Sequence, residues 1–235
     1  MTATPIVALD FPNAARAFQL VDTLEDSCRF YKVGSELFTA EGPVIVGRLR
    51  EHGCEVFLDL KLHDIPNTVA AAVRSIAAIG ATLTTVHATG GRAMLRAAGS
   101  AANEAGGCRV LAVTILTSLN PDAAADAWGL PALDIREQVL RLAAIARDEG
   151  VHGVVCSGAE ARAVRETHGS DFAVLVPGVR LPGDVAADQA RVVTPEAAVQ
   201  AGADYIVLGR SVTAAKDPRK AMEEVRRLVL SATAA

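Results

Sequence analysis

The feature that most limits the possible folds is an alternation of short apolar runs with longer amphipathic segments along the whole chain. Short strands that alternate with helices are typical of parallel α/β sheets. The runs predicted as strands are residues 5–10, 30–38, 55–61, 82–88, 109–116, 152–158, 172–180 and 205–212. Eight such units in 235 residues predict a closed (β/α)₈ TIM barrel that occupies residues 1–235 as a single domain. An open doubly wound sheet is the alternative, but no GxGxxG motif follows the first run.

Composition excludes several classes of partner and compartment. With 51% hydrophobic residues and a net charge of −4, the chain can form a large core and gives no general attraction for nucleic acid or an anionic membrane. Its four cysteines are far apart without a CxxC pair, which argues against a zinc site or disulfides and suits a reducing cytosol. The sequence shows neither a signal peptide nor a membrane span. We therefore expect a cytoplasmic protein.

Opposite charges stand together at the end of the third predicted strand, in the segment FLDLKLHDIPNT (57–68). Alternate residues of a strand share a face, so Asp59 and Lys61 should point the same way, with Asp64 nearby. Lys32 and Asp10 end the second and first runs, and the ends of barrel strands meet at one mouth. Buried ion pairs stabilise a fold weakly, because desolvation can exceed the Coulomb attraction. We therefore expect this cluster to serve function rather than stability.

A second candidate site lies after the last two strands, where barrels commonly bind phosphate. Arg210 and Gly209 end the eighth run, and Arg180 follows the seventh. A guanidinium can hold two phosphate oxygens, and a glycine lets the backbone approach closely. The polar segment 181–194 is long enough to form a lid, with Gln189 as its most plausible phosphate ligand.

Metal and cofactor motifs are not found in the sequence. It has no HExxH, no P-loop and no pattern of two histidines with one carboxylate. The sequence therefore gives no reason to require a metal ion.

At this point the residues resemble a known family. The segment DLKLHDIPNT is similar to the DxKxxDIPNT signature of the orotidine 5′-phosphate decarboxylases, which complete UMP synthesis. The likeness continues in order through VALDF, YKVGSELF, VTILTS, VPGVR, DQARVVTP and LGRS, and it is closest to the bacterial short form. The resemblance implies a homodimeric TIM barrel that converts orotidine 5′-phosphate to UMP and CO₂ without a metal or cofactor. Nucleic acid and membranes are not implied as partners.

The resemblance also implies roles for the charged cluster. Lys61 corresponds to the proton donor to C6 of the pyrimidine, and Asp59 to the residue that faces the departing carboxylate. Asp64 would reach in from the partner subunit to support Lys61. Lys32 would link this cluster to the ribose.

The remaining matched positions correspond to substrate contacts. Asp10 and Thr68 match contacts to the ribose, with Thr68 again supplied by the partner subunit, and Thr117 matches a contact to the pyrimidine edge. The phosphate contacts match Arg180, Gln189, Gly209 and Arg210.

Two alternatives remain at the level of sequence. Related Mg²⁺-dependent barrels, which resemble 3-keto-L-gulonate 6-phosphate decarboxylase and hexulose-phosphate synthase, share DxKxxD but carry a glutamate where this chain has Lys32. A cation at that position would repel a metal ion, which disfavours this alternative. A catalytically silent barrel that only binds a nucleotide is disfavoured by the complete charge array.

Overall fold

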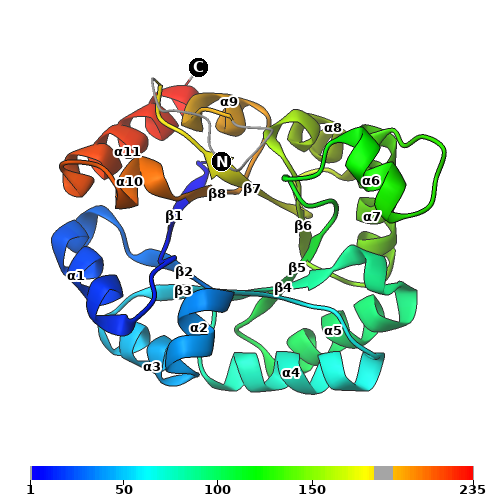
Figure 1. Cartoon of the computed structure of the whole chain (residues 1–235), viewed down its shortest axis with the longest axis horizontal. Coiled ribbons are helices and arrows are strands. Elements are labelled where there is room, and N and C mark those ends of the chain that lie inside the picture. Colours follow the sequence, from blue (N-terminus) through cyan, green and yellow to red (C-terminus); the bar gives the residue numbers. More distant parts are fainter. Residues whose placement is uncertain (1, 183–192, 235) are drawn as a thin grey trace.

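Eight parallel strands form a closed barrel in the order in which they occur in the chain, and β1 pairs with β8 to close it (Figure 1). The computed structural model describes residues 2–182 and 193–234. The strands are β1 (Thr4–Ala8), β2 (Phe30–Gly34), β3 (Glu55–Leu62), β4 (Leu83–His87), β5 (Arg109–Val113), β6 (Gly153–Val155), β7 (Ala173–Val179) and β8 (Tyr205–Leu208). The predicted TIM barrel is confirmed, and the open doubly wound sheet is excluded.

Helices surround the barrel as an outer ring (Figure 1). They are α1 (Ala14–Leu24), α2 (Ser35–Glu41), α3 (Val44–Glu51), α4 (Pro66–Ala78), α5 (Arg92–Ala105), α6 (Pro121–Ala127), α7 (Ile135–Asp148), α8 (Gly158–His168), α9 (Pro195–Gln200), α10 (Arg210–Thr213) and α11 (Pro218–Ala234). Short 3₁₀ turns lie at Glu25–Ser27 and Ala88–Gly90. None of the helices in the described part of the chain is long and apolar enough to cross a membrane.

Side chains of the strands alternate between two apolar layers, as the twofold period of a strand requires. Ile6 packs inside the barrel with Phe57, Leu111 and Leu175. Val7, the neighbour of Ile6, belongs instead to the larger cluster between the strands and the helices. The barrel interior is therefore a filled core of apolar side chains.

Several predicted strands are too long. The second ends at Gly34, and the residues that follow form α2, in which Leu37 is fully buried. The eighth ends at Leu208 and is followed by α10. Short apolar runs such as SELF suit either a strand or a helix, so their period does not fix the boundary.

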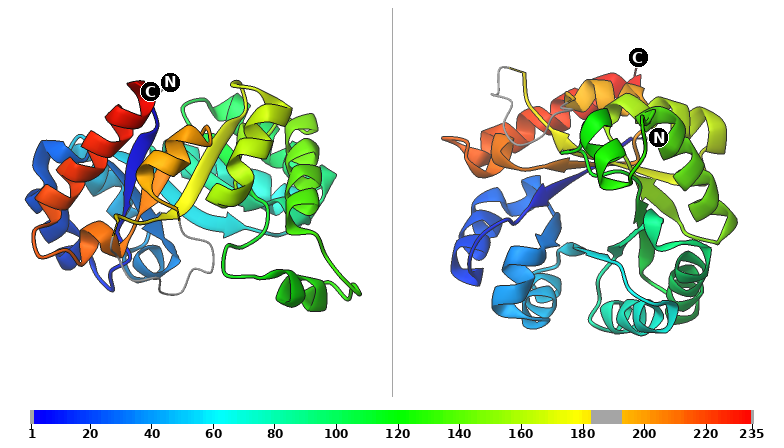
Figure 2. Two further views of the ribbon diagram at one scale, coloured as in Figure 1. Left: turned by 90° about the horizontal axis from the view of Figure 1, so that it is seen from above. Right: turned by 45° about the vertical axis from the view of Figure 1, so that its right-hand side comes forward.

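The two ends of the barrel differ. Helix α6, which follows β5, projects from the body at the end where the strands finish, whereas both chain termini lie at the opposite end (Figure 2). Asn120 accepts a hydrogen bond from Ala123 N and so caps this short helix.

Candidate active site

A cavity of about 490 Å³ opens at the carboxyl ends of the strands. This volume lies within the range typical of pockets for small ligands. Charged side chains line it in two groups. Asp10, Lys32, Asp59 and Lys61 come from the first three strands, and Arg180 and Arg210 follow β7 and β8.

The first group is a chain of alternating charges. Lys32 Nζ lies 2.7 Å from Asp10 Oδ1 and 3.9 Å from Asp59 Oδ2. Lys61 Nζ lies 2.7 Å from the same Asp59 oxygen. The side chains of Lys32 and Asp59 are largely shielded from solvent, whereas 38% of the Lys61 side chain is exposed. The Lys61 ammonium is therefore held in place by Asp59 and remains open to a ligand.

The backbone at Lys61 departs from a regular strand. Leu58 pairs with Thr84 and Leu62 pairs with Val86, so three residues of β3 stand opposite the single residue Thr85 of β4. Lys61 has a φ of 51°, in the left-handed region that a side chain rarely adopts. Bulges of this kind redirect side chains next to active sites. The side chains of Asp59 and Lys61 do lie together as expected, but a β-bulge brings them together and not the simple alternation of side chains along a strand.

Gly34 provides space for this cluster. It pairs with Asp59 across β2 and β3, and its backbone has a φ of −92°, which any residue can adopt. A Cβ atom added at Gly34 would lie 2.9 Å from Lys32 Nζ and 3.1 Å from Asp10 Oδ1. The glycine is therefore needed for room and not for backbone freedom.

The floor of the cavity is apolar. Phe57, Val113, Val155, Leu175 and Val207 line it, and all belong to the cluster inside the barrel. These side chains cannot hydrogen-bond water, so charges at the floor act through a medium of low polarity. Electrostatic interactions are stronger there than in bulk solvent.

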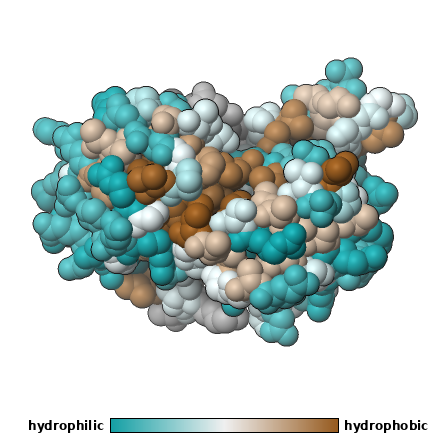
Figure 3. All heavy atoms as spheres, turned by 90° about the horizontal axis from the view of Figure 1, so that it is seen from below, coloured by the Kyte–Doolittle hydropathy of each residue, from teal (hydrophilic) through white to brown (hydrophobic). Residues whose placement is uncertain are grey.

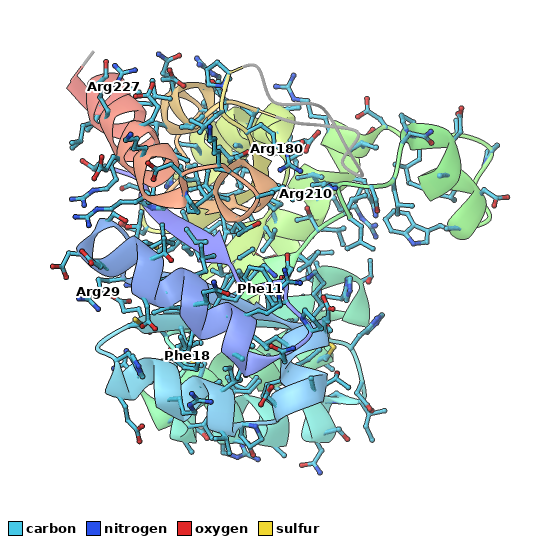
Figure 4. All side chains as sticks on the ribbon, turned by 60° about the vertical axis from the view of Figure 1, so that its left-hand side comes forward. Phe11, Phe18, Arg29, Arg180, Arg210 and Arg227 are labelled. Carbon is cyan, nitrogen blue, oxygen red and sulfur yellow. The ribbon has the colours of Figure 1, made fainter. Side chains whose placement is uncertain are left out.

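The second charged group follows β7 and β8 and lines the same cavity. Arg180 and Arg210 both line it, and Figure 4 labels the two residues near each other beside α10, of which Arg210 is the first residue. The buried Nε atom of Arg180 has no hydrogen-bond partner among the described residues. Gly209 also lines the cavity, and a Cβ atom added there would meet nothing within 4 Å. Two guanidinium groups beside exposed backbone form a suitable site for a phosphate.

The other predicted site residues fall in three places. Thr117 lines the cavity. Asp64 and Thr68 are exposed and do not line the cavity of their own chain, and Asp64 Oδ1 accepts a hydrogen bond from Ile65 N at 2.6 Å. Gln189 and most of the predicted lid 181–194 lie outside the described residues.

His87, at the end of β4, does not line the cavity. Burial lowers the pKa of His87, and the neighbouring His63 and Lys61 lower it further. The His63 and His87 rings lie 5.4 Å apart between centroids. The lowered pKa favours a neutral imidazole at this position.

The sequence interpretation does not include Thr85, which is completely buried beside the cluster. Its Oγ1 donates to Asp59 Oδ1 at 2.8 Å and accepts from Lys61 N at 3.0 Å. A threonine inside an apolar strand is common, so the segment TLTTVHA holds no signal that separates Thr85 from Thr84. Within residues 2–182 and 193–234, no group of three or more His, Cys, Asp or Glu side chains is arranged to hold a metal ion.

Comparison with known proteins agrees with this arrangement. Residues 4–225 match the model of the Orotidine 5'-phosphate decarboxylase / HUMPS family. The chain is 51% identical over 217 residues to orotidine 5'-phosphate decarboxylase of Halorhodospira halophila, covering 92% of this chain and 91% of the relative. It is 47% identical over 219 residues to the Moorella thermoacetica protein of the same name, covering 91% and 86%.

A solved structure agrees as well. The crystal structure of orotidine 5'-phosphate decarboxylase from Lactobacillus acidophilus superposes with a TM-score of 0.86 at 36% identity, covering 97% of this chain and 99% of that chain. The family model, which matches residues 4–225, includes every strand of the barrel and both charged groups of the cavity. The chain therefore belongs to the Orotidine 5'-phosphate decarboxylase / HUMPS family.

Proposed function

We propose that this protein decarboxylates orotidine 5′-phosphate to UMP in pyrimidine biosynthesis. The observation that carries the proposal is the pairing of a Lys–Asp array with two arginines across one cavity. A nucleotide that bears a carboxylate on its base and a phosphate on its ribose carries negative charge at both ends. The curated relatives reported above bear the name of this activity.

The reacting end contains a cation held where a carbanion would form. The C6–carboxylate bond breaks, CO₂ leaves, and the electron pair stays on C6 in an orbital that is not conjugated with the ring carbonyls. Lys61 then gives a proton from Nζ to C6. The ammonium, which Asp59 holds at 2.7 Å, stabilises this charge through space, and each tenfold gain in rate needs about 1.4 kcal/mol.

The binding end positions the substrate for this step. Arg180, Arg210 and the backbone of Gly209 bind the phosphate, joined by Gln189 from the segment 181–194. Asp10 and Lys32 contact the ribose, and Thr117 contacts the pyrimidine edge. Binding energy from the phosphate, which does not react, can hold the base against Lys61 and so raise the rate.

Lys32 disfavours the Mg²⁺-dependent sugar-phosphate alternative. Its ammonium lies 2.7 Å from Asp10 and 3.9 Å from Asp59, between the two carboxylates that a divalent cation would use. A metal ion placed there would meet a fixed positive charge. The same argument supports a reaction in which protein cations, without a metal, balance the charge of the substrate.

The proposed assembly is a homodimer in which the partner subunit's Asp64 and the partner subunit's Thr68 complete each site. Among the described residues, no ion pair joins Asp64 to Lys61 of the same chain. Val44 and Ile65 are 64% and 67% exposed at the starts of α3 and α4. Figure 3, seen from the side that these helices cover, shows a hydrophobic patch on this face. A second copy would bury such a patch.

The proposed compartment is the cytoplasm. All four cysteines are buried, and none of them forms a disulfide bond among the described residues. Burial raises the pKa of the Cys28 and Cys108 thiols to about 11, which keeps them protonated and unreactive. Cysteines that act as small apolar side chains suit a reducing environment.

Ultraviolet absorbance tests the proposed reaction, because losing the carboxylate changes the absorbance of the pyrimidine. Purified protein should convert orotidine 5′-phosphate to UMP with EDTA present, and Lys61→Ala should abolish turnover while UMP still binds. Activity that disappears on chelation and returns with Mg²⁺ would favour the sugar-phosphate alternative instead.

A further inference from the structure

Thr85 occupies an unusual position between the two most important residues of the cavity. It is completely buried and does not line the cavity, so it cannot touch a substrate. Its Oγ1 lies 2.8 Å from Asp59 Oδ1 and 3.0 Å from Lys61 N. We propose that Thr85 is a positioning residue that fixes the side chain of Asp59 and the backbone of Lys61 relative to each other for proton transfer. This inference rests on the proposed decarboxylation.

The direction of both hydrogen bonds follows from the groups involved. The Lys61 amide can only donate, and an ionised Asp59 carboxylate can only accept. The Thr85 hydroxyl must therefore accept from Lys61 N and turn its own proton toward Asp59 Oδ1. A hydroxyl is the smallest side-chain group that can do both at once.

The bulge explains why a side chain is needed here. The register between β3 and β4 shifts between Leu58 and Leu62, opposite Thr85. The amide of Lys61 is bonded to the Thr85 side chain in place of a backbone carbonyl. Without the hydroxyl this partly buried amide donor would lose its partner, and the left-handed backbone at Lys61 would lose a restraint.

The same hydroxyl fixes the orientation of the Asp59 carboxylate. Oδ2 faces Lys61 Nζ and Lys32 Nζ, while Oδ1 accepts from Thr85. A carboxylate bonded through both oxygens cannot rotate about its terminal bond. Loss of the Thr85 contact would let it turn and carry the Lys61 ammonium away from its position facing C6.

The chain offers a matched control in Thr84, the preceding residue of β4. Thr84 is also completely buried, and its Oγ1 donates at 2.9 Å to Leu58 O, a backbone acceptor of the same strand β3. Among the described residues, no hydrogen bond joins the Thr84 side chain to Asp59 or Lys61, because this side chain points to the opposite face of β4. Thr84→Val and Thr85→Val each remove one buried hydroxyl without changing shape.

The test compares kcat and UMP affinity in these two variants. Thr85→Val should lower kcat about 10- to 100-fold, as expected for a hydrogen bond to a charged group, with the Kd for UMP changed less than about threefold. Thr84→Val should keep kcat within about threefold of wild type at a similar loss of thermal stability. Thr85→Ser, which retains the hydroxyl, should restore most of kcat.

A second pair covers the case in which Thr85→Val does not fold. Thr85→Ser and Thr85→Ala both lack the methyl group and differ only in the hydroxyl, so kcat of the serine variant should exceed that of the alanine variant about tenfold or more. If wild-type protein is active, equal kcat values for wild type and Thr85→Val, or for Thr85→Ser and Thr85→Ala, would overturn the role of Thr85. They would leave the proposed function intact. Wild-type protein that leaves orotidine 5′-phosphate unchanged would overturn the proposed function, and the role of Thr85 with it.

Discussion

Lys61 Nζ lies 2.7 Å from Asp59 Oδ2, and the backbone between these residues is not a regular strand. Lys61 adopts a φ of 51°, which costs a residue other than glycine about 1–3 kcal/mol. The ion pair and the bond from Lys61 N to Thr85 hold this conformation. Strain at the residue that we propose as the proton donor lowers stability while it fixes the position of the side chain, and it can be measured.

Replacing Lys61 separates strain from chemistry. Lys61→Ala and Lys61→Gly should both lose more than about 10,000-fold in kcat, because both lack the general acid and the cation. Lys61→Gly should nevertheless have a free energy of unfolding about 1 kcal/mol larger than that of Lys61→Ala, since glycine accepts a positive φ. Chemical denaturation of the two proteins checks this order. Equal stabilities would mean that the left-handed backbone carries no strain.

Gly34→Ala tests the space beside the charged cluster. The new methyl group would lie 2.9 Å from Lys32 Nζ, so the flexible end of that lysine must move. We expect kcat/KM to fall about tenfold or more, while the free energy of unfolding changes by less than about 1 kcal/mol. Gly47→Ala in α3 is the control, because a Cβ atom there meets nothing within 4 Å. Unchanged kcat/KM in Gly34→Ala would show that the Lys32–Asp10 pair need not be held in place.

Arg180→Ala and Arg210→Ala test the phosphate end. Each should raise KM for orotidine 5′-phosphate about 10- to 100-fold, as expected for loss of a charge-assisted hydrogen bond. Turnover of orotidine, which lacks the phosphate, should change little. Arg136→Ala, at an exposed position of α7, serves as the control. Equal losses with both substrates would remove the two arginines from the phosphate site.

Mixing two inactive variants tests whether Asp64 serves the partner subunit. In a dimer of Lys61→Ala with Asp64→Ala, one site carries both defects and the other carries neither. After subunits exchange at equal concentrations, activity should rise to about a quarter of the wild-type value. Each variant kept separate provides the baseline. If the mixture stayed inactive although mass measurements showed mixed dimers, Asp64 would act within its own chain.

Acid should destabilise the fold partly through His152. Burial lowers the pKa of His152, and Arg109 lowers it further. Its Nδ1 accepts from Val110 N at 3.2 Å, and its Nε2 lies 3.1 Å from Asn103 Oδ1, an arrangement that suits a neutral ring. The unfolded chain therefore binds a proton more readily than the folded one. The stability that neutral His152 provides is fully present above pH 6.5, its usual pKa, and is lost as pH falls through the lowered value.

Urea denaturation at pH 7.5 and pH 5.5 measures this effect. The free energy of unfolding should be smaller at the lower pH in wild-type protein. The decrease should be smaller in His152→Gln, which cannot titrate. An identical decrease in both proteins would assign the acid sensitivity to other groups.

Much of the fold follows from the sequence because strands and helices differ in period. The strands predicted at residues 55–61 and 172–180 correspond to β3 and β7 of the structure. The assignment failed after Gly34, where the apolar residues of SELF continue from a strand into α2 without a polar break. A run of four residues is too short for the twofold period of a strand or the 3.6-residue period of a helix to show where one element ends and the next begins.

The sequence predicts which residues form the site better than it predicts how they are arranged. Charged residues at the ends of strands identified Asp10, Lys32, Asp59 and Lys61, all of which line one cavity. The bulge at Lys61 and the bonds of Thr85 depend on how β3 meets β4, which no local pattern records. Contributions from a second subunit lie beyond the geometry of one chain, so the roles of Asp64 and Thr68 remain predictions.

Closure of the barrel ties the formation of the cavity to the last strand. Asp10 follows β1 and Arg210 follows β8, and these strands are bonded to each other through Val7 and Leu208. During synthesis, a nascent chain that has not yet produced Tyr205 lacks the neighbour that β1 requires. Ligand affinity should therefore emerge late and abruptly as the ribosome elongates the chain, since no intermediate length has both halves of the pocket.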